Sequence, residues 1–273
     1  MFVREYGRAG APVVVLHGGP AAVGDVAPLA RALGESFLAL EPWQRGSGSE
    51  PLTVAKHVED LHALIRTRSR DAAPAVVGHS WGAMLALCYA AAHPDAAGPI
   101  VLVGCGTFDR ESRETMKRTF AERTGEELRR RIDELVATEP DPAERHMKTF
   151  RLTRGLSAFD LVEPWPDDLE YDGLDLRAHD ETWRDMLRLQ DDGTYPRAFA
   201  AIRSPVLMLH GDYDPHPGRM IRESLRPFVP QLDYRELERC GHTPWLERHA
   251  RDEFLAILRS WLALRLAEAG PAP

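Results

Sequence analysis

In the first hundred residues, short apolar runs alternate with segments of helical periodicity. The runs are rich in consecutive Val, Leu and Ile, as in "VVVL" at 13–16, which is typical of strands buried on both faces. The segments between them repeat apolar residues three or four positions apart, which is the spacing of one helix face. This alternation predicts a mostly parallel sheet flanked by helices. The predicted strands are residues 2–7, 13–16, 37–41, 75–79 and 99–104, and the predicted helices are residues 24–33, 53–68 and 81–92.

The pattern changes between residues 107 and 200. This stretch has no apolar run of the buried-strand type and begins with a charged amphipathic segment, which predicts a helical insertion. The alternation resumes with strands at 205–211 and 232–237 and helices at 218–227 and 247–268. We therefore expect an α/β core of about seven strands made of residues 1–106 and 201–268, with residues 269–273 as a disordered tail.

Composition argues against several classes of protein. The 273 residues are 44% hydrophobic and 28% charged, as in ordinary globular domains. The net charge is −8 and Lys and Arg form no dense run, so we expect no nucleic-acid partner. The sequence has no apolar run of membrane-spanning length and no signal-peptide pattern, so we expect a cytoplasmic protein with no membrane partner. Its three cysteines form no CxxC pair; Cys88 and Cys105 are predicted to be buried thiols and Cys240 is left open.

The segment "GHSWG" at 78–82 follows a predicted strand and opens an apolar helix. Gly78 and Gly82 have no side chains to clash in a tight strand-to-helix turn, so Ser80 can be held in a strained conformation with its hydroxyl exposed. This context predicts that Ser80 is a nucleophile. A chance occurrence of the pattern in a glycine-rich turn is the alternative.

Two further loops supply chemistry that a serine nucleophile needs. "LHGGP" at 16–20 ends a strand, and the backbone N–H groups of Gly19 and Trp81 are predicted to hold an oxyanion. "GHTPW" at 241–245 follows the last predicted strand, and His242 is predicted to be the base that activates the serine. An acid that orients the histidine should lie between them in the chain, and "HGDYDPHP" at 210–217 offers Asp212 and Asp214.

The same eight residues could instead bind a metal ion, because His210, Asp212, Asp214 and His216 alternate along them. On a regular strand these side chains would share one face. Gly211 and the prolines that follow predict a turn, in which convergence of the four is not expected. We therefore expect no metal site here and no cofactor, with His210 and His216 playing no part.

These motifs, in this order, resemble the α/β-hydrolase fold over nearly the whole chain. The resemblance implies that Asp214, three residues after the glycine that ends its strand, is the acid, with Asp212 as the alternative. It also implies that residues 107–200 are a helical cap over the active site. "LHGGP" and "QRGSG" at 44–48 are particularly similar to the prolyl iminopeptidase branch, although Trp43 stands where that branch has Asp and Ala21 where it has Gly.

The resemblance implies a hydrolase of a small-molecule ester or amide, with the ester slightly favoured because the iminopeptidase motif is incomplete. A prolyl iminopeptidase-type aminopeptidase is the alternative, and a binding protein that keeps the triad is an alternative of another class. Ser80 argues against the relatives of this fold that use an aspartate nucleophile, and a metallohydrolase is disfavoured. The cap offers a possible acyl or ring pocket and a cluster of carboxylates that could pair with a free amino group. The pocket candidates are Trp165, Trp183, Met186 and Tyr195, and the carboxylates are Glu163, Asp167, Asp168, Glu170, Asp172 and Asp175.

Overall fold

The structure is a computed structural model that describes residues 1–20, 23–68, 73–162 and 175–269. Within these residues the chain builds a seven-stranded sheet in the order β1-β3-β2-β4-β5-β6-β7. Only β1 runs antiparallel to its neighbour, and the other adjacent strands are parallel. The strands are β1 Val3–Tyr6, β2 Pro12–Leu16, β3 Leu38–Pro42, β4 Ala75–His79, β5 Ile100–Val103, β6 Val206–Gly211 and β7 Leu232–Leu237. The prediction of a mostly parallel sheet of about seven strands is confirmed.

Alternate residues of the central strands enter different hydrophobic cores. Val14 and Leu16 of β2 pack into one core, while Val13 and Val15 pack into the other. The reason is the period of two along a strand, which sends successive side chains to opposite faces of the sheet. Both faces are covered by helices, so nearly every position in these strands is buried, and the strands read as unbroken apolar runs.

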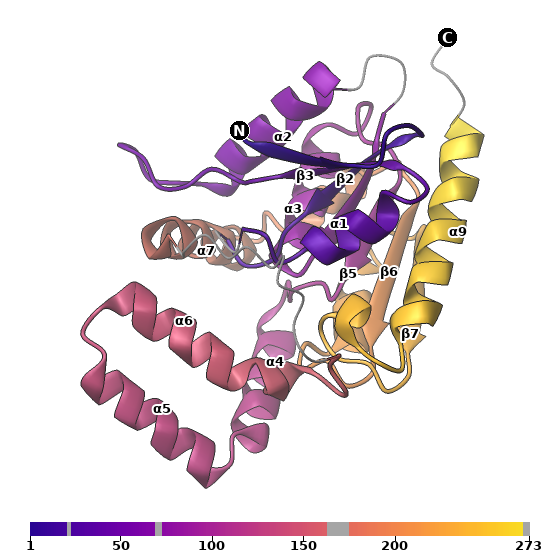
Figure 1. Cartoon of the computed structure of the whole chain (residues 1–273). Coiled ribbons are helices and arrows are strands. Elements are labelled where there is room, and N and C mark those ends of the chain that lie inside the picture. The colour runs from indigo at the N-terminus through magenta and orange to yellow at the C-terminus, as the bar shows by residue number, and fades with distance from the viewer. Residues whose placement is uncertain (21–22, 69–72, 163–174, 270–273) are drawn as a thin grey trace.

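Helices cover the two faces of the sheet (Figure 1). One core contains buried residues of α2 Val54–Arg68, α3 Trp81–Ala92 and α8 Gly218–Leu225. The other contains those of α1 Ala27–Leu33 and α9 Arg251–Ala269. Helix α3 is buried along most of its length, which explains why its sequence is apolar on all sides.

Between β5 and β6 the described residues form helices and no strand of the sheet. They are α4 Arg110–Arg123, α5 Glu126–Thr138, α6 Pro142–Thr153, the short 3-10 helix η1 Arg154–Ser157, α7 Leu176–Asp191 and the 3-10 helix η2 Arg197–Ala201. Figure 1 shows α5 and α6 as a helical hairpin that stands away from the sheet, and α5 buries none of its residues. The assignment of residues 107–200 to a cap remains a prediction. The expected disordered tail lies outside the described residues except for Ala269, which ends α9.

The three cysteines are free and buried. No helix among the described residues is both long enough and apolar enough to cross a membrane. The loops that follow β2, β4, β5, β6 and β7 all leave the same edge of the sheet, because these strands are parallel. In open α/β sheets this carboxyl edge is where ligands bind, and four of these five loops carry the motifs singled out above.

Candidate active site

Ser80 lies at the junction of β4 and α3 with a strained backbone. Its φ is 53° and its ψ is −114°, a combination that residues with a side chain seldom adopt. The two flanking glycines make the turn possible. A Cβ on Gly78 would lie 2.2 Å from the carbonyl oxygen of Gly82, and a Cβ on Gly82 would lie 2.4 Å from that of Leu16. The Ser80 N–H donates to Val103 at the end of β5 at 2.9 Å, which fixes the turn on the sheet edge.

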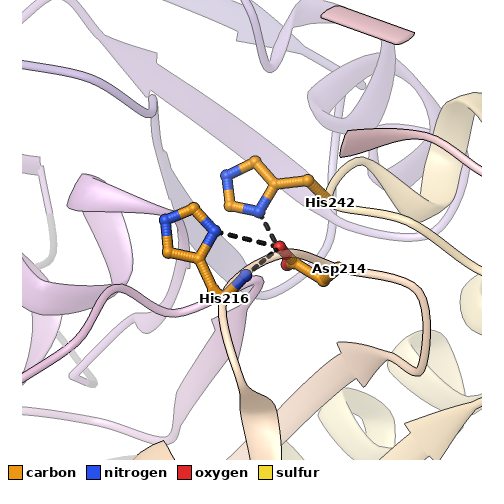
Figure 2. Close-up of side chains that lie close together, drawn as sticks. All are labelled: Asp214, His216 and His242. Atoms are coloured by element: carbon orange, nitrogen blue, oxygen red, sulfur yellow. Dashed lines mark hydrogen bonds and ion pairs between the residues drawn. The ribbon is translucent and has the colours of Figure 1, made fainter. Parts of the chain in front are cut away.

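Asp214 and His242 are brought together by the loops after β6 and β7. The Nδ1 atom of His242 lies 2.7 Å from Asp214 Oδ2 (Figure 2). Asp212 is used differently, because its Oδ1 accepts the N–H of Cys240 at 3.1 Å. The carboxylate of Asp212 thus helps hold the histidine loop while that of Asp214 contacts the imidazole. No hydrogen bond between Ser80 and His242 is found in the described part of the chain.

Asp214 also contacts two other histidines of the segment 210–217. His216 Nδ1 and the His216 backbone N–H lie 2.9 Å from Oδ1, and His210 Nε2 lies 3.2 Å from Oδ2. The four side chains therefore do not all converge, but three of them, His210, Asp214 and His216, do lie together. The turn after Gly211 folds the chain back so that His216 reaches the carboxylate from one side, while His210 reaches it from within β6. Only Asp212 stays outside this cluster.

The electrostatics of the cluster favour an ionised Asp214. Burial by itself would raise the pKa of Asp214, but the attraction of His242, His216 and His210 and a hydrogen bond from His210 hold it well below its ordinary value. Burial lowers the pKa of His216, only partly offset by the carboxylate. A buried anion surrounded by imidazoles can stabilise a positive charge on one of them, which is the task of the acid in a triad.

The backbone of His242 is held by two hydrogen bonds. Its N–H donates to the carbonyl of Ser157 at 2.7 Å, and its carbonyl accepts from His79 Nε2 at 3.1 Å. Below the ring lies Gly104, whose φ of 53° suits glycine and where a Cβ would come within 3.0 Å of His242 Nδ1. The ring therefore lies against the sheet edge with Nδ1 on the carboxylate, which leaves Nε2 as the nitrogen available to a reacting group.

His79, the residue before the nucleophile, links the histidine loop to the loop after β2. Its Nδ1 lies 3.2 Å from Asp25 Oδ2, while its Nε2 contacts the carbonyl of His242. Asp25 in turn accepts the N–H of Gly18 at 3.0 and 3.2 Å. Because the Gly18 N–H is engaged in this way, the loop donor for an oxyanion would have to be the next one, that of Gly19, as the sequence predicts.

A second chain of hydrogen bonds holds the predicted oxyanion loop against α3. The N–H of Gln44 donates to His17 Nε2 at 3.1 Å, and the ring of His17 contacts the carbonyl of Gly18 through Nδ1 at 3.0 Å. The side chain of Gln44 bridges the carbonyl of His17 and Nε1 of Trp81, at 3.3 and 2.7 Å. Burial lowers the pKa of His17, in keeping with a neutral ring whose two nitrogens have different roles. His17 and Gln44 were not among the predicted site residues, although both lie inside quoted motifs.

Trp183, one of the predicted pocket residues, packs against Trp81, which follows Ser80 in the chain. Its ring is 5.9 Å from that of Trp81 in an edge-to-face arrangement, and it is partly buried. Met186 is fully buried in the core, and Tyr195 stacks on Phe199 at 4.9 Å. These contacts account for Met186 and Tyr195 by packing.

Of the remaining residues predicted to form the substrate site of the cap, only Asp175 lies within the described residues. Trp165 lies outside the described residues, as do all members of the carboxylate cluster except Asp175. Asp175 caps α7 through the N–H of Ala178 at 3.0 Å and accepts the N–H and hydroxyl of Ser47 at 2.7 Å each. Its carboxylate is therefore already satisfied by groups of this chain.

A buried carboxylate that sequence reasoning missed lies beside the histidine loop. Glu247 is fully buried, and its two oxygens accept the N–H groups of Gly241 at 2.9 Å, Phe159 at 3.0 Å and Asp160 at 2.7 Å. It thus ties the loop that carries His242 to the segment after η1. The only signal in the sequence is an acidic residue five positions after the candidate base, within the predicted helix.

Comparison with known proteins agrees with this architecture. A model of the alpha/beta hydrolase family matches residues 13–257, and the chain belongs to that family. The proline iminopeptidase of Lactobacillus helveticus (strain DPC 4571) is 24% identical over 277 residues, covering 92% of this chain and 89% of that protein. Among solved structures, VinJ has a TM-score of 0.69 at 20% identity, covering 96% of this chain and 94% of its own. A thermophilic esterase from Thermogutta terrifontis has a TM-score of 0.63 at 19% identity, covering 96% and 93%. The predicted resemblance is confirmed at the level of the family.

Proposed function

We propose that this protein is a serine hydrolase that cleaves an ester or amide bond of a small molecule. In this proposal Ser80 is the nucleophile, His242 the general base and Asp214 the acid that orients it. The backbone N–H groups of Gly19 and Trp81 receive the oxyanion. The observation that carries the proposal is the strained turn at Ser80, on the same sheet edge as the 2.7 Å contact between Asp214 and His242.

The proposed reaction has two stages. Ser80 Oγ attacks the acyl carbon while Nε2 of His242 takes its proton, and the same proton then goes to the leaving alcohol or amine. An acyl-enzyme remains. Water then gives a proton to His242 and attacks the acyl carbon, which releases the acid and restores Ser80. The buried anion of Asp214 stabilises the imidazolium in both stages, and the reaction needs no cofactor.

Labelling with a fluorophosphonate tests the nucleophile directly. The parent protein should become covalently modified at Ser80, and Ser80→Ala should neither label nor hydrolyse p-nitrophenyl esters above background. A binding protein that merely keeps these residues would not label. Hydrolysis by Ser80→Ala at the parent rate, with purity checked by mass spectrometry, would refute the assignment.

A prolyl iminopeptidase-type aminopeptidase is the second candidate. It is favoured by the similarity to the L. helveticus enzyme and by the contacts between His17 and Gln44, which come from the two motifs shared with that branch. A panel of p-nitrophenyl esters of rising chain length beside aminoacyl anilides, including the proline anilide, separates the two. Preference for the proline anilide by kcat/KM would select the aminopeptidase, and preference for an ester would select the esterase. Ser80→Ala serves as the blank in both.

A further inference from the structure

His216 is a second imidazole on the carboxylate that contacts His242. The Nδ1 atoms of the two rings lie 2.9 and 2.7 Å from the two oxygens of Asp214. The rings lie 4.5 Å apart and are nearly parallel, with 15° between their planes. One possible ligand atom from each of the three residues lies within 4.8 Å of the others. Figure 2 shows both rings turning the same nitrogen toward the shared carboxylate.

We propose that Asp214, His216 and His242 form a binding site for a divalent transition metal ion such as Zn²⁺, and that occupation of this site switches the hydrolase off. The binding half of the proposal stands on the geometry alone. The inhibitory half rests on the proposed function, because it needs His242 to be the base.

The donor set suits such an ion. Two imidazole nitrogens and one carboxylate oxygen are a known zinc ligand set that leaves a fourth position open. With bonds of about 2.0–2.1 Å in a tetrahedral site, two donors to one Zn²⁺ lie about 3.4 Å apart. The donor atoms, which lie within 4.8 Å of one another, therefore have to approach by up to about 1.4 Å. The rings must tilt out of their parallel arrangement to point both lone pairs at one ion. Their side chains are 16% and 14% exposed, which gives the ion a path of entry.

The surroundings hold the two ligands in place while their rings turn. The carbonyl of His216 accepts from His210 Nε2 at 2.9 Å, and the N–H of His242 donates to Ser157. These bonds are made by backbone atoms of His216 and His242 and involve neither imidazole ring. The side chain of Asp214 is fully buried, where low local polarity strengthens the attraction between a carboxylate and a divalent cation.

Metal binding at Nδ1 changes what His242 can do. A neutral imidazole has one N–H, so a ring bound to metal through Nδ1 carries its proton on Nε2. Nε2 then has no lone pair with which to accept the proton of Ser80. The ion also takes the carboxylate that would otherwise stabilise the imidazolium. Inhibition should therefore be complete at saturation and reversible by a chelator.

The test is a titration of the EDTA-treated 273-residue chain with Co²⁺, which reports its ligands through visible absorption. A titration with Zn²⁺ follows, with ester hydrolysis as the readout. His216→Gln is the informative variant, because glutamine keeps an N–H that can reach Asp214 but lacks a strong nitrogen ligand. His249→Gln is the matched control, since the side chain of His249 is 41% exposed and lies outside the cluster. Each variant is compared with its own rate in the absence of metal.

We expect one equivalent of Co²⁺ to bind, Zn²⁺ to inhibit in parallel and EDTA to restore the rate. His216→Gln should weaken both binding and inhibition by at least about tenfold, and His249→Gln should change neither. Equal metal sensitivity in the parent and His216→Gln, or no Co²⁺ binding, would overturn the proposal. Co²⁺ binding that depends on His216 in a protein that fails to label at Ser80 would instead refute the proposed function and leave the metal site standing.

Discussion

Asp214 is the residue on which the candidate site converges. Its side chain is fully buried, and three imidazoles and a backbone N–H contact its two oxygens. A buried carboxylate of this kind is tolerated because hydrogen bonds within the protein replace those that it would make to water. Removing its charge should therefore affect both the orientation of His242 and its ability to become a cation.

Asp214→Asn should lower kcat by about 10³–10⁴-fold, because the amide presents an N–H where the imidazole needs an acceptor and favours the wrong tautomer. Asp212→Asn is the matched control, since asparagine keeps an oxygen for the N–H of Cys240. The measurement is ester hydrolysis together with thermal unfolding of both variants. The reverse ranking, with Asp212→Asn the more damaged at equal stability, would show that Asp212 is the acid.

At the residue scale, the sequence proposed Asp214 only through resemblance, and the spacing alone left Asp212 open. The geometry separates them because the chain turns sharply after Gly211, so the two carboxylates point to different partners. The same turn explains why the metal-ligand spacing misleads. Alternation describes a strand, whereas His216 reaches Asp214 only after the strand has ended.

At the scale of elements, Glu247 connects two parts of the chain that are far apart in sequence. The segment 157–162 runs beside 241–248, with Leu161 and Glu247 paired as an antiparallel bridge and the Val162 N–H donating to Leu246 at 2.8 Å. The carboxylate of Glu247 lies within this junction and accepts N–H groups from both sides. The position of His242 is thereby coupled to the segment that follows α6 and η1.

Glu247→Gln should destabilise the protein by about 2–3 kcal/mol. Backbone N–H groups now donate to both oxygens of a buried anion, whereas in the variant the amide NH₂ of glutamine would face some of these N–H groups and lose their hydrogen bonds. Glu238→Gln is the matched control, because it makes the same substitution at an exposed residue in the turn after β7. Hydrogen exchange at Gly241, Phe159 and Asp160 is the readout that a general loss of stability would not reproduce. Faster exchange confined to these amides, with a lower kcat, is the expected outcome. Unchanged exchange at these amides would refute the coupling between the His242 loop and the segment after η1.

Across the whole molecule, buried neutral histidines make the fold sensitive to acid. Burial lowers the pKa of His57 from 6.5 to about 4, and it also lowers the pKa of His17. His57 packs against Trp81 and contacts the hydroxyl of Thr182 at 3.1 Å. In the unfolded chain these rings take up protons at higher pH than in the folded chain. Stability must therefore be greatest above the unfolded pKa and fall as the pH drops towards the folded one.

We expect the free energy of unfolding to decrease between about pH 6.5 and 4, with His57 accounting for on the order of 3 kcal/mol of the change. Urea unfolding at closely spaced pH values gives this slope. His57→Gln should flatten it, and the comparison at pH 8, where the parent ring is neutral in both states, isolates the cost of lost packing. A slope that is equally steep in His57→Gln would place the acid sensitivity elsewhere.

The sequence by itself determined the sheet, the family and the order of the motifs, because each depends on patterns within short stretches of chain. Continuous apolar runs specify strands buried on both faces, and the glycines around Ser80 specify a turn into which no side chain fits. Tertiary structure alone decided what surrounds His242. The contacts of His79 and Asp214 with His242 join loops that are 163 and 28 residues apart in the sequence, and they exist only because parallel strands bring those loops to one edge.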